Sequence, residues 1–332
     1  MSAAEFAPVL EFLRRAGLAA ADETPAAAPL SGGVSSDIWR VELRSGPVCV
    51  KRALPRLRVA QLWEAPVERN RYEWRWMEIA VRAVPGVAPR VLAHDDAGVF
   101  AMEFLGGLPL WKAELRAGRA EPEFARLVGE RLAAIHAATA GDAEVARRFA
   151  TDANFHAIRL EPYLLAAARA HAPLAPALEA LAERTARTKL VLVHGDISPK
   201  NILVRKEGPV FLDAECAWYG DPAFDLAFCA NHLLLKCLWT PQAAPPFLAC
   251  FDSLAAGYLA GAGWEPRVAL EARAASLLPG LLLARVDGKS PVEYLTEETQ
   301  KDRVRRVAGM LLRDPPERLA QIREAWQKEL AA

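Results

Sequence analysis

One polar loop set among apolar runs constrains this chain more than any other feature. The loop is His194-Gly195-Asp196-Ile197-Ser198-Pro199-Lys200-Asn201. Apolar runs with the length of buried strands precede and follow it, and the last of them ends on Asp213 after a turn at Gly208. The three runs are Leu190–Val193, Ile202–Val204 and Val210–Leu212. A hairpin of the second and third runs would fold Asp213 back beside Asn201.

Three oxygen-bearing side chains in this arrangement suit the transfer of a phosphoryl group. That reaction needs a carboxylate that orients the attacking hydroxyl, and oxygen ligands that hold magnesium against a triphosphate. Asp196 and Asn201 stand five residues apart in the loop, and the hairpin adds Asp213. We therefore expect these three side chains to converge on a two-metal nucleotide site.

The first third of the chain has the pattern of a sheet. Trp39, Val41 and Leu43 alternate with charged residues, which is the period of a half-buried strand. Ser45-Gly46-Pro47 is turn chemistry, and Pro85-Gly86 ends a helical pattern. The predicted elements are a strand at 39–43, a returning strand at 48–51, a helix at about 67–84, and a hairpin of 91–94 with 99–104.

This part of the chain also offers groups for the nucleotide phosphates. Lys51 ends the returning strand and could reach the α- and β-phosphates, and Glu73 on the following helix could hold it through an ion pair. A run of small residues lies ahead of Lys51, where backbone amides could approach phosphate oxygens. The candidates in this run are Ser31, Gly32, Gly33 and Ser35.

Simpler interpretations stay open for each of these groups. Gly32-Gly33 also suits an ordinary hairpin turn, and a lysine at the end of a strand is often solvated. Glu73 has neighbours of the same kind, and a glutamate in a helix commonly lies on a solvated face. The competing glutamates are Glu64, Glu68 and Glu78.

Four further residues lie in or near the loop. We expect structural roles for two of them and leave two roles open for each of the others. We expect His194 to be packed and hydrogen-bonded, and Asp225 to be structural, either accepting hydrogen bonds from the loop or capping the helix that it opens. Glu215 could touch a metal through water or cap local structure. Lys200 could lean on the γ-phosphate or be solvated.

These residues and their spacing resemble a known group of enzymes. His194-Gly195-Asp196, Asn201 and Asp213 match the pattern of the aminoglycoside phosphotransferase and choline kinase superfamily, whose members are relatives of protein kinases. Within it the chain is most similar to the 5-methylthioribose kinases, over roughly residues 28–290. The stretches that carry this likeness are Val50–Arg58, Leu192–Asp196, and Asp213–Gly220 running on to Phe224-Asp225.

The resemblance implies roles for particular residues. Asp196 would be the catalytic base, Asn201 and Asp213 would bind magnesium, and Lys51 would contact the phosphates of ATP. The end of the 99–104 strand would be the hinge that binds adenine, with Glu103, Phe104 and Leu105 as nucleotide-binding residues. The cofactors implied are ATP and Mg²⁺.

The chain departs from the methylthioribose kinase pattern in the region expected to bind the acceptor. Those enzymes carry an Arg-Arg pair that contributes to the sugar site, whereas here Arg285 is followed by Asp287 and Lys289. We therefore expect a different acceptor, such as a sugar, a polyol or an amino alcohol. Arg285 could grip an anionic or hydroxyl-rich group, and Asp287 could accept hydrogen bonds from hydroxyls.

Composition restricts the partners. Lys plus Arg equals Asp plus Glu at 41 each, so the net charge gives no reason to expect nucleic acid as a partner. The sequence contains no run of 18 apolar residues, so we expect no membrane span. Five cysteines without a Cys-x-x-Cys pair suit reduced thiols, and we expect a cytoplasmic location. The sequence does not predict the oligomeric state.

Together these features predict an α+β fold of the protein-kinase type with two lobes. Residues 1–105 would form a small antiparallel sheet lobe that binds nucleotide, and residues 106–332 a larger, mainly helical lobe with the catalytic loop, the metal site and the acceptor site. The predicted function is ATP-dependent transfer of the γ-phosphate to a hydroxyl of a small molecule. An aminoglycoside-type antibiotic phosphotransferase and a nucleotide-binding pseudokinase module remain alternatives. A protein kinase is disfavoured because Asp-Phe-Gly and Ala-Pro-Glu are absent.

Overall fold

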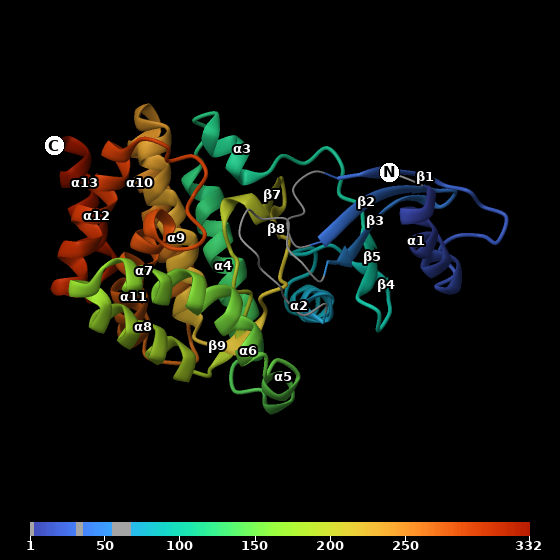
Figure 1. The fold of residues 1–332 in the computed structure, drawn as a ribbon, viewed down its shortest axis with the longest axis horizontal. Coiled ribbons are helices and arrows are strands. Elements are labelled where there is room, and N and C mark those ends of the chain that lie inside the picture. Colours follow the sequence, from blue (N-terminus) through green and yellow to red (C-terminus); the bar gives the residue numbers. More distant parts are fainter. Residues whose placement is uncertain (1–2, 31–35, 55–67) are drawn as a thin grey trace.

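The strands of the N-terminal part gather at one end of the molecule, and helices make up most of the remainder (Figure 1). The computed structural model describes residues 3–30, 36–54 and 68–332. The N-terminal elements are α1 (Ala3–Arg15), β1 (Ala26–Pro29), β2 (Ser36–Leu43), β3 (Gly46–Ala53), α2 (Arg69–Ala83), β4 (Val91–His94) and β5 (Val99–Glu103).

Within the described residues, the first five strands form one antiparallel sheet in the order β1-β2-β3-β5-β4. Successive side chains of β3 lie on opposite faces of the sheet, and each face packs against a different helix. Val48 and Val50 pack with α1, whereas Cys49 packs on the opposite face with the core around α2. Lys51 follows Cys49 at the period of two and so lies on the α2 side. The small antiparallel sheet predicted from the sequence is confirmed.

The chain leaves the sheet through a glycine-containing link. β5 ends at Glu103 and α3 begins at Trp111, and between them Gly107 has φ +78°, which glycine adopts without strain. We propose that the boundary between the lobes lies in this link, where the sequence analysis placed it between residues 105 and 106.

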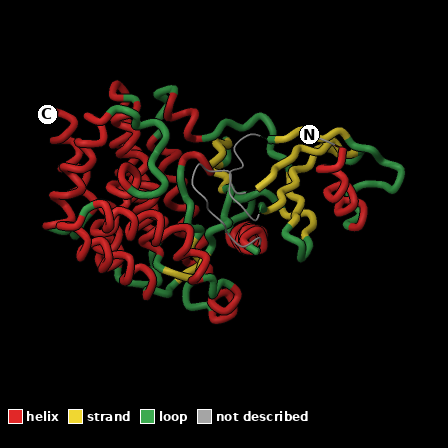
Figure 2. Tube along the Cα trace, in the orientation of Figure 1, coloured by secondary structure: helices red, strands yellow, loops and turns green. Residues whose placement is uncertain are grey.

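The C-terminal part is mainly helical, as expected, and Figure 2 shows its strands as short pieces among the helices. α9 is buried along nearly its whole length, so it forms the centre of this part. The helices are α3 (Trp111–Arg116), α4 (Pro122–Thr139), α5 (Ala143–Arg148), α6 (Asp152–Phe155), η1 (His156–Leu165), α7 (Ala166–Ala170), η2 (Ala172–Leu174), α8 (Ala175–Arg187), η3 (Pro199–Asn201), α9 (Pro222–Trp239), η4 (Pro241–Ala243), α10 (Ala244–Gly261), α11 (Arg267–Asp287), α12 (Glu298–Arg313) and α13 (Leu319–Ala331).

The three apolar runs around the polar loop are strands, as predicted. Two of them pair as an antiparallel hairpin in which Ile202 is opposite Phe211. The first run pairs instead with a strand that the sequence analysis did not predict, and this strand follows the hairpin directly. These strands are β6 (Val191–Val193), β7 (Ile202–Arg205), β8 (Gly208–Phe211) and β9 (Trp218–Gly220).

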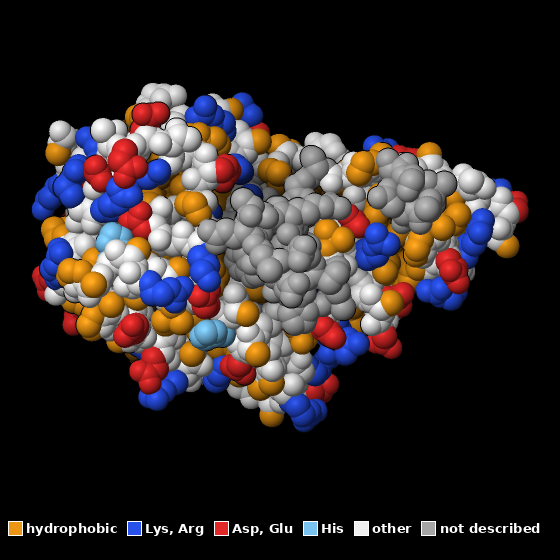
Figure 3. All heavy atoms as spheres, viewed as in Figure 1, with side chains coloured by type: hydrophobic (Ala, Val, Ile, Leu, Met, Phe, Trp, Pro, Cys, Tyr) orange, Lys and Arg blue, Asp and Glu red, His pale blue; other side chains and the backbone are white. Residues whose placement is uncertain are grey.

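On the face drawn in Figure 3, the Lys and Arg side chains of the described residues are interspersed with Asp and Glu. Large apolar side chains that are exposed in the described part of the chain occur singly, at Leu110, Val268 and Met310. In that same part, no helix combines the length and the apolar character needed to cross a bilayer.

Candidate active site

Lys51 lies at the junction between the sheet and the polar loop. Its Nζ is 2.6 Å from Glu73 Oε2 on α2 and 2.5 Å from Asp213 Oδ1, just after β8. Lys51 is 2% exposed and Glu73 is 1% exposed, so water screens the ion pair between these two residues little. The structure thus has the ion pair between Lys51 and Glu73 that the sequence suggested, and adds a second one across the two parts of the chain.

The charges of this group favour phosphate and metal chemistry. Burial disfavours the charged form of Lys51, but the carboxylates of Asp213 and Glu73 outweigh burial and raise the pKa of Lys51 above its usual value. Burial also opposes the ionisation of Asp213, yet Lys51 and Lys200 hold the pKa of its carboxyl group below the ordinary range. A full cation and a full anion therefore stand side by side at neutral pH.

Asp225 anchors the polar loop to the first turn of α9. Its Oδ2 accepts a hydrogen bond from the backbone N–H of His194 at 2.7 Å, and its Oδ1 accepts one from Gly195 at 2.8 Å. Gly195 has φ +79°, and a Cβ there would lie 2.7 Å from the carbonyl oxygen of Cys216. Only glycine therefore fits this point of the loop.

His194 fixes the shape of the loop from within. Its Nδ1 accepts from the N–H of Asp196 at 3.1 Å, and its Nε2 donates to the carbonyl of Leu212 at 3.1 Å. Burial lowers the pKa of His194, so the ring is neutral and can both donate and accept. Trp76 of α2 packs edge-on against this ring. The contacts of His194 and Asp225 match the structural roles expected from the sequence.

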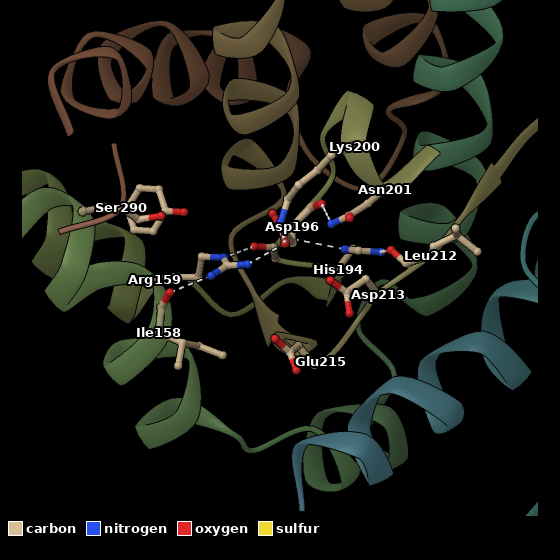
Figure 4. A network of polar contacts seen from close by, with 12 residues as sticks. Ile158, Arg159, His194, Asp196, Lys200, Asn201, Leu212, Asp213, Glu215 and Ser290 are labelled. Carbon is tan, nitrogen blue, oxygen red and sulfur yellow. Dashed lines mark hydrogen bonds and ion pairs between the residues drawn. The ribbon is translucent and has the colours of Figure 1, made fainter. Parts of the chain in front are cut away.

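Asp196 lies at the centre of the close-up in Figure 4. Its Oδ2 is 2.9 Å from Arg159 Nη2 and 3.2 Å from Lys200 Nζ. Oδ1 has no hydrogen-bond partner within the described ranges. One carboxylate oxygen is thus held by two cations, while the other is able to accept a hydrogen bond from a hydroxyl group.

Asn201 and Asp213 lie together because the hairpin folds one beside the other. The N–H of Leu212 donates to the carbonyl of Asn201 at 2.9 Å. The amide nitrogen of Asn201 donates to the carbonyl of Asp196 at 3.0 Å, which leaves its side-chain oxygen as an acceptor. Asp213 has φ +68°, a strained conformation for a residue with a Cβ, and such strain clusters at functional sites.

The two residues fit a magnesium ion by their chemistry. Both present hard oxygen donors, and the side chain of Asp213 is 30% exposed. Among the described residues no group of three or more His, Cys, Asp or Glu side chains could hold a metal without help. Magnesium is commonly bound by one or two side chains together with phosphate oxygens and water.

Several predicted residues have other partners or lie elsewhere. Glu215 Oε2 accepts from Arg69 Nε at 3.1 Å. Both oxygens of Asp287 are bound by Arg305, and His171 binds one of them. Its expected contact with an acceptor stays a prediction. Arg285 instead donates to the hydroxyl of Tyr163 at 3.2 Å.

The predicted adenine hinge ends β5 and begins the link to α3. Glu103 pairs with Val48 at the end of the sheet, and the guanidinium of Arg40 lies 4.8 Å from the ring centroid of Phe104. Leu105 follows in the link. The four residues of the predicted glycine loop, Ser31, Gly32, Gly33 and Ser35, lie outside the described residues.

Sequence reasoning missed two arginines of the site. Arg159 binds Asp196 and also donates through Nε to the carbonyl of Gly195, and Arg69 binds Glu215. Arg159 lies on η1, a stretch of π-helix between α6 and α7. Its sequence neighbours carry no motif, although π-helical turns often occur at functional sites. Only its three-dimensional contacts reveal it.

Comparison with known families places these residues in context. A sequence model of the phosphotransferase enzyme family (APH) matches residues 26–264, which include every residue of the polar loop and the hairpin. The chain belongs to this phosphotransferase family. The resemblance drawn from the sequence is confirmed at the level of the family.

Individual relatives are more distant. The methylthioribose kinase of Cronobacter sakazakii is 28% identical over 258 residues, which are 68% of this chain and 64% of that enzyme. This chain thus spans less than two thirds of the length of that relative. The choline kinase of Cryptosporidium parvum has a similar structure, with a TM-score of 0.58 and 12% identity, over 93% of this chain and 96% of that one.

A second solved structure agrees on the fold. The choline/ethanolamine kinase family protein of Mesorhizobium loti aligns with a TM-score of 0.50 and 17% identity, over 98% of this chain and 99% of that one. At such identities the likeness shows the fold alone. The predicted two-lobed phosphotransferase fold is confirmed.

Proposed function

We propose that this phosphotransferase moves the γ-phosphate of ATP to a hydroxyl group of a small molecule. The observation that carries the proposal is the convergence of Asp196, Asn201 and Asp213 from one loop and one hairpin, with Lys51 bound to Asp213 from the separate sheet. Membership of the phosphotransferase family supports the same chemistry.

The geometry supports the following reaction. The acceptor hydroxyl donates to Oδ1 of Asp196, while Arg159 and Lys200 hold Oδ2. The hydroxyl oxygen forms a bond to the γ-phosphorus, and the bond from that phosphorus to the oxygen it shares with the β-phosphate breaks. ADP leaves, and the hydroxyl proton passes to Asp196.

Charge on the phosphates is stabilised from two sides. Lys51, fixed by Glu73, supplies a buried cation for the phosphate oxygens. Asn201 and Asp213 would hold magnesium, which supplies further positive charge against the triphosphate when bound. The hinge at Glu103–Leu105 and the loop at residues 31–35 would hold the remaining parts of ATP, as the family resemblance implies.

Substitution of the base tests the proposal. Asp196→Asn should lower phosphate transfer roughly 10²–10⁴-fold, because the amide cannot take the proton. The affinity for Mg-ATP, measured by titration calorimetry, should change little. Asp96→Asn is the control, since Asp96 is fully exposed in the turn between β4 and β5. Full turnover in the Asp196→Asn variant would remove the residue from this role.

A further inference from the structure

A buried lysine on α9 has no acidic partner. Lys236 is 1% exposed, and within the described part of the chain its Nζ makes no ion pair and no hydrogen bond. The Nζ lies 4.5 Å from the ring centroid of Trp239 and 4.4 Å from that of Tyr294. Aromatic faces compensate a buried ammonium group only in part, and Glu293, whose charge favours the ammonium form of Lys236, is itself paired with Lys112.

Two other basic side chains next to it are also incompletely satisfied. His232 lies one turn earlier on α9, and its Nε2 is buried without a hydrogen-bond partner in the described ranges. Its Nδ1 is 3.4 Å from the hydroxyl of Tyr294. Arg285 of α11 is buried as well, with an unpartnered Nε and no carboxylate among its contacts there. We call His232, Lys236 and Arg285 the basic cluster.

The basic cluster is linked to the proposed base by direct contacts. Arg159, which binds Asp196, lies 5.7 Å from the ring centroids of both Tyr163 and Phe228. Tyr163 accepts from Arg285 at 3.2 Å, and Phe228 packs edge-on against His232. Figure 4 places Ser290, a partner of Arg285, on the same side of Asp196 as Arg159. The cluster is therefore two side chains away from the point of phosphate transfer.

We propose that the basic cluster binds an anionic group of the acceptor, so that the small molecule phosphorylated here is a hydroxylated carboxylate or phosphate. This inference rests on the proposed function and names the class of acceptor for the same site. Arg285 and Lys236 would supply the charge, and neutral His232 would donate through Nε2. The hydroxyl group that reacts would then lie toward Asp196.

The surrounding charges favour an anion. Lys112 adds positive charge near Lys236, and Glu293, whose charge opposes it, is paired with Lys112. Burial, followed by the positive charges of neighbours, lowers the pKa of Lys236 to about 7. An anion bound there would raise this pKa again and favour the charged ammonium form. A cationic acceptor such as an amino alcohol or an aminoglycoside would meet repulsion at the same place.

Two sets of acceptors test the inference. Within each set the carbon skeleton is the same and the charge differs. Mg-ATP turnover would be measured with glycerol, glycerate, glycerol 3-phosphate and 3-amino-1,2-propanediol, and with glucose, gluconate, glucose 6-phosphate and glucosamine. We expect the highest kcat/KM within each set for a carboxylate or phosphate member, and the two anionic members separate the two chemistries. A neutral or cationic member that is used as well or better would overturn the inference but leave the proposed function intact.

Variants of the basic cluster supply the second arm. Lys236→Met should raise KM for the preferred anionic acceptor at least tenfold, because removal of one partner of a buried charged contact is costly. Lys328→Met, which removes an exposed lysine on α13, is the matched control and should not change KM. His232→Gln gives an independent reading with a smaller change in KM. Unchanged KM in both cluster variants would contradict the inference. If no acceptor and no condition gives ATP turnover, the proposed function itself fails.

Discussion

Arg159 shows how a single side chain can set the geometry of a reacting group. It is buried, it donates to the carbonyl of Gly195, and it holds one oxygen of Asp196 at 2.9 Å. Burial opposes the charge of Arg159, but the carboxylate of Asp196 outweighs it and raises the pKa of the guanidinium. Arg159 is thus a positioning residue that acts through Asp196.

Arg159→Met should lower kcat about 10²-fold, since small displacements of a reacting group cost that much. KM for ATP should remain within about twofold, because Arg159 does not contact the proposed phosphate site. Steady-state kinetics measure both values, and Arg159→Lys should restore only part of kcat because lysine lacks the planar fork. Arg169→Met is the control, since Arg169 is exposed on the neighbouring α7. A rise in KM for ATP with normal kcat would show that Arg159 acts elsewhere.

Lys236 also predicts how stability depends on pH. Its pKa is lowered by burial, then by Lys112, Arg285 and Arg116 against the opposing effect of Glu293, to about 7 from 10.5. Below pH 7 Lys236 is charged in the folded protein, so its burial lowers the free energy of unfolding by the full amount. Between pH 7 and 10.5 the folded state is neutral while the unfolded state still binds the proton, so the cost falls as pH rises.

Lys236→Met should therefore be more stable than the original protein near pH 6, and the gap should narrow as the pH rises from 7 toward 10. Urea unfolding at a series of pH values, without added anions, measures the two free energies of unfolding. A gap that is constant over this range would mean that Lys236 is not a destabilised cation in the folded state.

At the scale of elements, two helices meet through glycines. A Cβ at Gly129 of α4 would lie 2.3 Å from the carbonyl of Leu254 on α10, and one at Gly257 of α10 would lie 2.4 Å from the carbonyl of Arg126 on α4. Contacts with backbone atoms cannot be relieved by rotating a side chain. The helices must therefore separate if either glycine gains a methyl group. His136 on α4 contacts Tyr258 on α10 and also Asp225 on α9, which binds the polar loop. The crossing of α4 and α10 therefore also supports the polar loop.

Gly129→Ala should destabilise the fold by about 1–3 kcal/mol through overpacking. Gly263→Ala is the matched control, because its Cβ would meet nothing within 4 Å and the position has no positive φ. Chemical unfolding of the two variants compares them directly. Equal stability of both variants would show that the helix crossing tolerates extra volume.

Elements were predictable from the sequence where the pattern was local. Alternation in 39–43 and the apolar runs at 202–204 and 210–212 identified β2, β7 and β8. β9 was missed because Trp218–Gly220 ends in a glycine and forms no aliphatic run, unlike its partner β6. The helix expected at 67–84 is described from Arg69 to Ala83 as α2.

At the scale of the whole molecule, residues of the local motif were predicted to lie close together and do so, whereas residues that meet only through packing were not predicted. The loop and hairpin placed Asn201 and Asp213 together because covalent connection and strand pairing fix their distance. Arg159 and the basic cluster lie on helices whose packing depends on the entire core, which no local pattern encodes. Asp287 was predicted to contact the acceptor, and its pairing with Arg305 of α12 was not predicted, because the two residues lie on different helices.

We propose that the sheet and the helical part of the molecule together build one nucleotide site. A crystal structure with a non-hydrolysable ATP analogue and Mg²⁺ tests it most directly. We expect a metal ion bound by Asn201 and Asp213, phosphate oxygens at Lys51 Nζ, and a γ-phosphate that faces Asp196. A metal ion bound elsewhere, or phosphates out of reach of Lys51, would contradict it.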